Sequence, residues 1–134
     1  MEDLLLLKTE FTPEIELSKS RSVFRFSGNS LTENAVDFYK PVIKWIKEYA
    51  NEVTGNSHFD CQFSEISQAS LKSLLFVFQE IKAIEMEGHA ISVAWYLPED
   101  EAKMKEIGQD ISYMTDVPFE YIFSKSKQDT PELV

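Results

Sequence analysis

The second half of the chain alternates strand and helix patterns, and this alternation restricts the fold more than any other feature. Residues 58–65 carry apolar side chains at every second position, which indicates a strand with one buried face. A broad apolar stripe at helical spacing follows and stops at Gly88. The apolar run 91–97, a further helical pattern and the strand pattern 119–123 complete the series. Because helical crossovers join parallel strands, we expect an α/β fold with a largely parallel sheet.

The first half adds strands of the opposite direction. The fragments EIEL and SVFRF alternate on either side of a polar turn, which predicts a β-hairpin over 14–26 that Gly28 and Asn29 end. The apolar run 4–7 is an edge strand or a docked arm. The hairpin makes the expected sheet mixed, with antiparallel strands at one edge.

Three main helices are expected to pack on this sheet. The first opens at a capping box of Ser30 and Glu33, and Pro41 inside its pattern predicts a kink or a break. The third starts at Pro98, with the acidic residues 99–101 in its first turn. The side chains expected to pack the second and third helices on the sheet are Leu71, Leu74, Leu75, Phe78, Met104, Ile107 and Ile111.

The length of 134 residues fits one domain. We expect this domain over 1–124 and a polar C-terminal tail over 125–134. Trp45 and Trp95 recur among apolar residues, so we expect both to be structural core residues.

The chain is acidic, with 13 basic against 23 acidic residues and a formal net charge of −10. This charge repels phosphate backbones and anionic membrane surfaces, so neither nucleic acid nor a membrane is an expected partner. The single cysteine, Cys61, cannot form an internal disulfide. The start lacks a basic region and its apolar run is too short for a signal or membrane segment, which predicts a cytoplasmic protein.

Motifs for catalysis or metal binding are not found in the sequence. His58 and His89 lie outside any metal-ligand spacing, and neither a phosphate-binding glycine loop nor a G-x-S-x-G motif occurs. The acidic clusters at 99–101 and around Glu85 and Glu87 are typical of solvated faces. We therefore expect no catalytic residue, no metal and no cofactor.

Three serines gather where the strand 58–65 meets the second helix: Ser64, Ser67 and Ser70. One interpretation makes Ser67 an ordinary N-cap. The other makes the junction a switch, because a helix N-terminus favours a phosphate group. The residues alone leave both interpretations open.

Several fragments of the stretch 12–49 stand in the order found in the SiaC family of bacterial biofilm-regulation phosphoproteins: TPEI, G-x-S-x-x-E-N-A, F-Y and P-V-I-x-W-I. The resemblance continues through 91–97 and 117–122 and covers nearly the whole chain. It implies a STAS-like fold, similar to anti-sigma-factor antagonists, and a regulatory protein without enzyme activity. It also implies a cognate kinase and phosphatase that act on a junction threonine, and a diguanylate cyclase that the dephosphorylated form binds and activates.

The junction departs from the family pattern at the switch position. The family's Asn-Thr-Ser-Ser-x-Lys corresponds to SQASLK at 67–72, so Gln68 stands where the phosphorylated threonine is expected. Either Ser67 or Ser70 has become the acceptor, or the chain is a permanently unphosphorylated form; we favour the second because glutamine is neutral. A small enzyme or ligand-binding protein without a recognisable motif is the alternative of another class. The predicted partner-binding or switch region is Ser64, Ser67, Gln68, Ser70 and Lys72.

Overall fold

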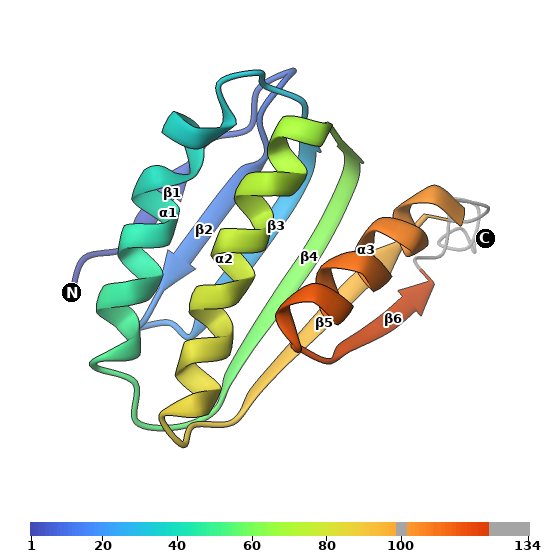
Figure 1. Ribbon diagram of the computed structural model, residues 1–134. Coiled ribbons are helices and arrows are strands. Elements are labelled where there is room, and N and C mark those ends of the chain that lie inside the picture. The colour runs from blue at the N-terminus through green and yellow to red at the C-terminus, as the bar shows by residue number, and fades with distance from the viewer. Residues whose placement is uncertain (99–101, 124–134) are drawn as a thin grey trace, which may run out of the picture.

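Six strands form one sheet in chain order, and the structure, a computed structural model, describes residues 1–98 and 102–123 (Figure 1). The strands β1, β2 and β3 pair antiparallel, whereas β3 to β6 run parallel. The mixed sheet with a hairpin at one edge is therefore confirmed. The strands are β1 (Leu4–Leu6), β2 (Glu14–Ser18), β3 (Val23–Ser30), β4 (Ser57–Ile66), β5 (Ile91–Leu97) and β6 (Phe119–Phe123).

Three helices connect the parallel strands: α1 (Ala35–Ala50), α2 (Gln68–Met86) and α3 (Ala102–Thr115). Each crossover joins neighbouring strands of the same direction, and right-handed crossovers of this kind place their helices on one side. Figure 1 shows all three helices over the same face of the sheet. The core consequently lies between that face and the helices, and the side chains of the other face are mainly polar.

The apolar side chains predicted for the second and third helices pack as expected. Leu74, Phe78, Met104 and Ile111 are buried, and Leu71, Leu75 and Ile107 are partly buried against the core.

Both tryptophans are buried, as predicted. The Trp45 indole donates a hydrogen bond to the carbonyl of Glu2 (2.7 Å). The Trp95 indole donates to the carbonyl of Met104 (3.0 Å) and stacks on Phe119 at 5.2 Å between ring centroids. Because buried indole N–H groups need acceptors, these bonds fix the position of each ring.

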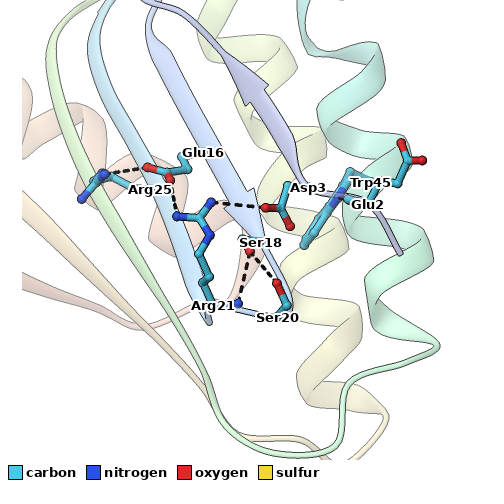
Figure 2. Close-up of polar contacts among 8 residues, drawn as sticks. All are labelled: Glu2, Asp3, Glu16, Ser18, Ser20, Arg21, Arg25 and Trp45. Carbon is cyan, nitrogen blue, oxygen red and sulfur yellow. Dashed lines mark hydrogen bonds and ion pairs between the residues drawn. The ribbon is translucent and has the colours of Figure 1, made fainter.

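The N-terminal run forms an edge strand, which decides between the two expectations for it. Ion pairs beside β2 and β3 hold this edge: Figure 2 shows the Arg21 guanidinium between Asp3 (3.3 Å) and Glu16 (2.8 Å). Glu16 also forms an ion pair with Arg25, with 2.6 Å between its Oε1 and the Arg25 Nη2. The hydrogen bond from Arg21, and then the charge of Arg21 and the hydrogen bond and charge of Arg25, keep the pKa of Glu16 below its usual value against the opposing effect of burial.

The strand β3 is longer than the sequence predicted. The expected end at Gly28 and Asn29 is wrong, because β3 continues through both to Ser30. Gly28 has a φ of +112°, which glycine adopts without strain, and the register with β4 shifts between Gly28 and Asn29. A bulge of this kind lets a strand keep pairing beyond an irregular residue.

The predicted capping box is also wrong. Ser30 is the last residue of β3, and α1 begins only at Ala35, after Asn34, whose side chain makes no capping bond. The Ser30 hydroxyl is buried and bonded elsewhere, so it cannot reach the helix amides that a capping box needs.

Two further expectations concern prolines. The helix α1 continues past Pro41 as one element, so the expected break is wrong and the alternative, a kink, stays a prediction. Pro98 lies outside α3, which is described from Ala102 onward. The acidic run 99–101 and the predicted tail 125–134 lie outside the described residues.

Candidate functional site

A single residue, Ser67, separates β4 from α2. Its backbone is extended (φ −79°, ψ 167°), and its Oγ accepts a hydrogen bond from the Ser70 N–H with an N–O distance of 3.1 Å. Its carbonyl accepts the first helical bond from the Leu71 N–H (2.9 Å). Ser67 is therefore the N-cap of α2, as the sequence predicted.

A chain of buried hydroxyl groups lies beneath this cap. Ser30 Oγ donates to Ser70 Oγ (2.7 Å) and lies 2.6 Å from the Tyr39 hydroxyl. A hydroxyl carries one proton, so Tyr39 is the donor to Ser30. The Ser67 N–H donates to the carbonyl of Ser30 (2.8 Å). These bonds tie the end of β3, the second turn of α1 and the start of α2 together.

The chain of hydroxyl groups is isolated from solvent. Ser30, Tyr39 and Ser70 have no exposed surface, and burial raises the pKa of the Tyr39 hydroxyl far above its usual value. All three groups consequently stay uncharged. Ser70 therefore serves the interior of the junction rather than its surface, in contrast to its place in the predicted region.

The other predicted residues lie on the surface, on two sides of the α2 start. Ser64 and the half-buried Ser67 line a hollow of about 280 Å³ toward α3. Gln68 and Lys72 are exposed and line a second hollow, of about 400 Å³, toward α1. The start of α2 thus forms a ridge between the two hollows, with Gln68 on the α1 side.

Two exposed apolar side chains complete the α1 side, and sequence reasoning missed both. Val36 is 73% exposed and Phe76 is 59% exposed, and both line the hollow with Gln68 and Lys72. Phe76 falls within the broad apolar stripe that indicates burial of this helix, but unlike its neighbour Val77 it is exposed. No local sequence pattern sets Phe76 or Val36 apart from the buried residues of its helix. Exposed apolar residues that gather in one hollow are typical of protein-binding surfaces.

The electrostatics of the ridge follow from the helix itself. The first turn of α2 contains no acidic residue, so its unpaired amides and partial positive charge are not offset by a side chain of that turn. A negative charge at position 68 would thus be tolerated by the helix, yet it would change the charge that the surface presents.

A polar cluster lies on the uncovered face of the sheet. His58 Nδ1 lies 2.7 Å from Ser92 Oγ and Nε2 lies 3.1 Å from Asp60 Oδ1, to which Tyr96 also donates (3.3 Å). His58 and Ser92 face each other across β4 and β5, whose backbone amides are engaged in strand pairing. The two hollows beside the α2 start are lined by other residues than this cluster.

Neither a cluster of metal ligands nor a membrane-spanning helix occurs among residues 1–98 and 102–123. No group of three or more His, Cys, Asp or Glu side chains there could hold a metal ion. In the same ranges, no helix has the length and apolar character needed to cross a membrane. The thiol of Cys61 is buried in β4, and burial raises its pKa.

Comparison with known proteins finds a matching family model and a relative in sequence. A sequence model described as "SiaC family regulatory phosphoprotein" matches residues 6–124. An uncharacterized protein of Pseudomonas aeruginosa strain UCBPP-PA14 is 19% identical over 119 residues, which cover 89% of this chain and 94% of that protein.

Two solved structures are similar in fold. SiaC of Pseudomonas aeruginosa is 19% identical with a TM-score of 0.80, and the match covers 92% of this chain and 98% of that chain. A chain in the crystal structure of the diguanylate cyclase SiaD in complex with its activator SiaC, from the same organism, is 18% identical with a TM-score of 0.83. That match covers 91% of this chain and 100% of the other. Since the family model extends over most of the sequence, the chain belongs to the SiaC family of regulatory phosphoproteins.

Proposed function

We propose that this chain is a regulatory module without enzyme activity that binds a diguanylate cyclase. Membership of a regulatory family supports this, as does the likeness to a structure in which SiaC is the activator of SiaD. The observation that carries the proposal is the exposed apolar pair, Val36 and Phe76, beside the position of the family's switch.

The proposed binding surface, the α2-start face, combines the surface residues of both hollows. It consists of Val36, Ser64, Ser67, Gln68, Lys72 and Phe76. The apolar side chains on its α1 side would supply the buried contact of an interface, and the polar residues beside them would fix its orientation. A strand-to-helix corner at the carboxyl end of parallel strands is also where α/β folds place their sites.

We further propose that Gln68 keeps the protein in the binding form. A glutamine side chain has no hydroxyl to phosphorylate and adds no charge to the α2-start face. Phosphorylation at this position would have added about two negative charges. A cognate kinase and phosphatase therefore have no substrate at position 68, and the chain acts as a permanently unphosphorylated member of the family.

If the switch has moved, Ser67 is the accessible acceptor. The Ser70 hydroxyl is buried and accepts from Ser30, so a kinase would have to open the junction to reach it. The Ser67 side chain is half-buried and can be reached at the surface, although its Oγ caps α2. Phosphate on Ser67 at high stoichiometry in the native protein would contradict the permanently unphosphorylated form and identify Ser67 as the acceptor.

We place the protein in the cytoplasm. Its one cysteine is buried in β4 and bears no disulfide, which fits a reducing compartment.

Affinity capture from the native cell tests the proposed function. The purified protein is used as bait, captured proteins are identified by mass spectrometry, and a captured cyclase is assayed with GTP with and without the bait. We expect capture and activation of a diguanylate cyclase by the wild type, and loss of both with Phe76→Glu. Tyr113→Glu, at an exposed aromatic residue on a different helix, α3, is the matched control and should behave as wild type. Equal capture by Phe76→Glu and wild type would contradict the proposed face.

A further inference from the structure

The last strand, β6, lies at an edge of the sheet. It ends the strand order of the sheet, and Figure 1 shows it with β5 on one side only. Within the described residues, no strand pairs with its other side. Its pairing with β5 is regular from Phe119 to Phe123, so no bulge bends the strand away from a neighbour.

The features that protect an edge strand are few in β6. Proteins block such edges with very short strands, prolines, lysines or bulges. The strand β1 at the opposite edge has three residues, whereas β6 has five and contains neither proline nor lysine. Its one charged residue is Glu120. The outer backbone groups of β6, which no other described strand pairs with, are therefore open to pairing with another strand.

The side chains of β6 divide into two faces. Phe119 packs against Trp95 on the helix-covered face, and Tyr121 and Phe123 share this face by strand alternation. Phe123 remains 65% exposed, with the Lys105 ammonium 5.9 Å from its ring centroid. Glu120 and the half-buried Ile122 point to the uncovered face of the sheet.

We propose that β6 pairs antiparallel with β6 of a second copy of this chain, with a two-fold axis at Tyr121. Centring the pair on the middle residue lets all five residues pair. Phe119 then lies opposite Phe123 of the second copy, so the exposed Phe123 ring gains an aromatic neighbour. Glu120 lies opposite Ile122 of the second copy, so no two like charges face each other. The two sheets become one continuous sheet of two-fold symmetry.

The inference does not rest on the proposed function, because β6 contributes no residue to the α2-start face. The net charge of −10 on each copy opposes association. Added salt screens this repulsion, so the dimer should strengthen as ionic strength rises.

Opposite charges at position 122 test the register by sedimentation equilibrium. The wild type should show a concentration-dependent dimer. Ile122→Glu places a carboxylate opposite Glu120 twice by symmetry, which should raise the dissociation constant roughly tenfold or more. Ile122→Lys places an ammonium opposite the same carboxylates and should keep the dimer or strengthen it. A wild type that stays monomeric at its highest soluble concentration overturns the proposal, as do equal effects of the two variants.

A cross-link supplies a second measurement that does not depend on affinity alone. In a Cys61→Ser background, Tyr121→Cys brings two thiols together at the axis, where Cα atoms of facing residues are about 4.5–5.5 Å apart and within reach of a disulfide. Glu120→Cys, which faces Ile122 instead, is the matched control. With circular dichroism confirming that both variants are folded, we expect covalent dimer in high yield only for Tyr121→Cys. Equal yields would refute the two-fold register.

Discussion

Replacing Ser30 with alanine should lower the free energy of unfolding by about 2–4 kcal/mol. The variant loses the hydrogen bond that Ser30 donates to Ser70, which contributes about 1 kcal/mol, and it leaves the Tyr39 hydroxyl buried without its acceptor. An unsatisfied buried hydroxyl adds about 1–3 kcal/mol. For a chain of 134 residues, the sum corresponds to a Tm lowered by roughly 7–14 °C.

A double-mutant cycle with Tyr39→Phe separates the loss of the buried hydroxyl hydrogen bonds from other effects of Ser30→Ala on stability. Tyr39→Phe alone should reduce stability by about 1 kcal/mol, because it removes the donor and leaves only an acceptor lone pair. In the double variant the tyrosine hydroxyl is no longer present to be unsatisfied. Its loss of stability should therefore be smaller than the sum of the two single losses by about 1 kcal/mol.

Urea unfolding followed by circular dichroism measures all three variants. Glu33→Ala is the control. A capping box would couple its effect on stability to that of Ser30→Ala, whereas the buried chain of hydroxyl groups predicts no such coupling. Additivity of Ser30→Ala and Tyr39→Phe within about 0.3–0.5 kcal/mol would refute the reasoning.

Three further predictions concern stability. Gly108→Ala would place a Cβ 2.6 Å from Nε1 of the fully buried Trp95. The overpacking costs about 1–3 kcal/mol of stability and should exceed the helix-propensity gain of about 1 kcal/mol. Denaturant unfolding should therefore show net destabilisation, and a more stable variant would contradict this packing. Ser67→Ala removes the N-cap and should reduce stability by about 1 kcal/mol, while an unchanged thermal midpoint would argue against the cap. Glu16, with its pKa held below 4.5, stabilises the fold above its unfolded pKa and loses that effect as pH falls through the folded pKa. The stability difference between wild type and Glu16→Gln should therefore be largest near neutral pH and shrink in acid, and a difference constant with pH would contradict the ion pairs.

The parts of the fold that sequence reasoning predicted are those in which one face is buried. The alternation in β4 and the apolar stripe of α2 repeat with the period of their own element, so a short window of sequence contains the signal. Ser67 belongs to the same class, because an N-cap is defined by the residues that directly follow it.

The features that were missed depend on residues far away in sequence. Ser30 followed by Glu33 reads as a capping box, but the serine is placed by Ser70, forty residues later. Ser70 appeared to share the surface with Gln68 for the same reason. The exposure of Phe76 is set by how α1 packs beside α2, which no local pattern reports.

The central claim is that the α2-start face binds its partner because position 68 carries no negative charge. The direct test is the affinity of the captured cyclase for Gln68→Glu, measured by isothermal titration calorimetry. Gln109→Glu, at an exposed position on α3, is a control with the same net charge. An acidic residue in the first turn of a helix is favourable, so the fold should remain intact. We predict that Gln68→Glu weakens binding roughly tenfold while Gln109→Glu binds as wild type. Equal affinity of Gln68→Glu and wild type would contradict the account.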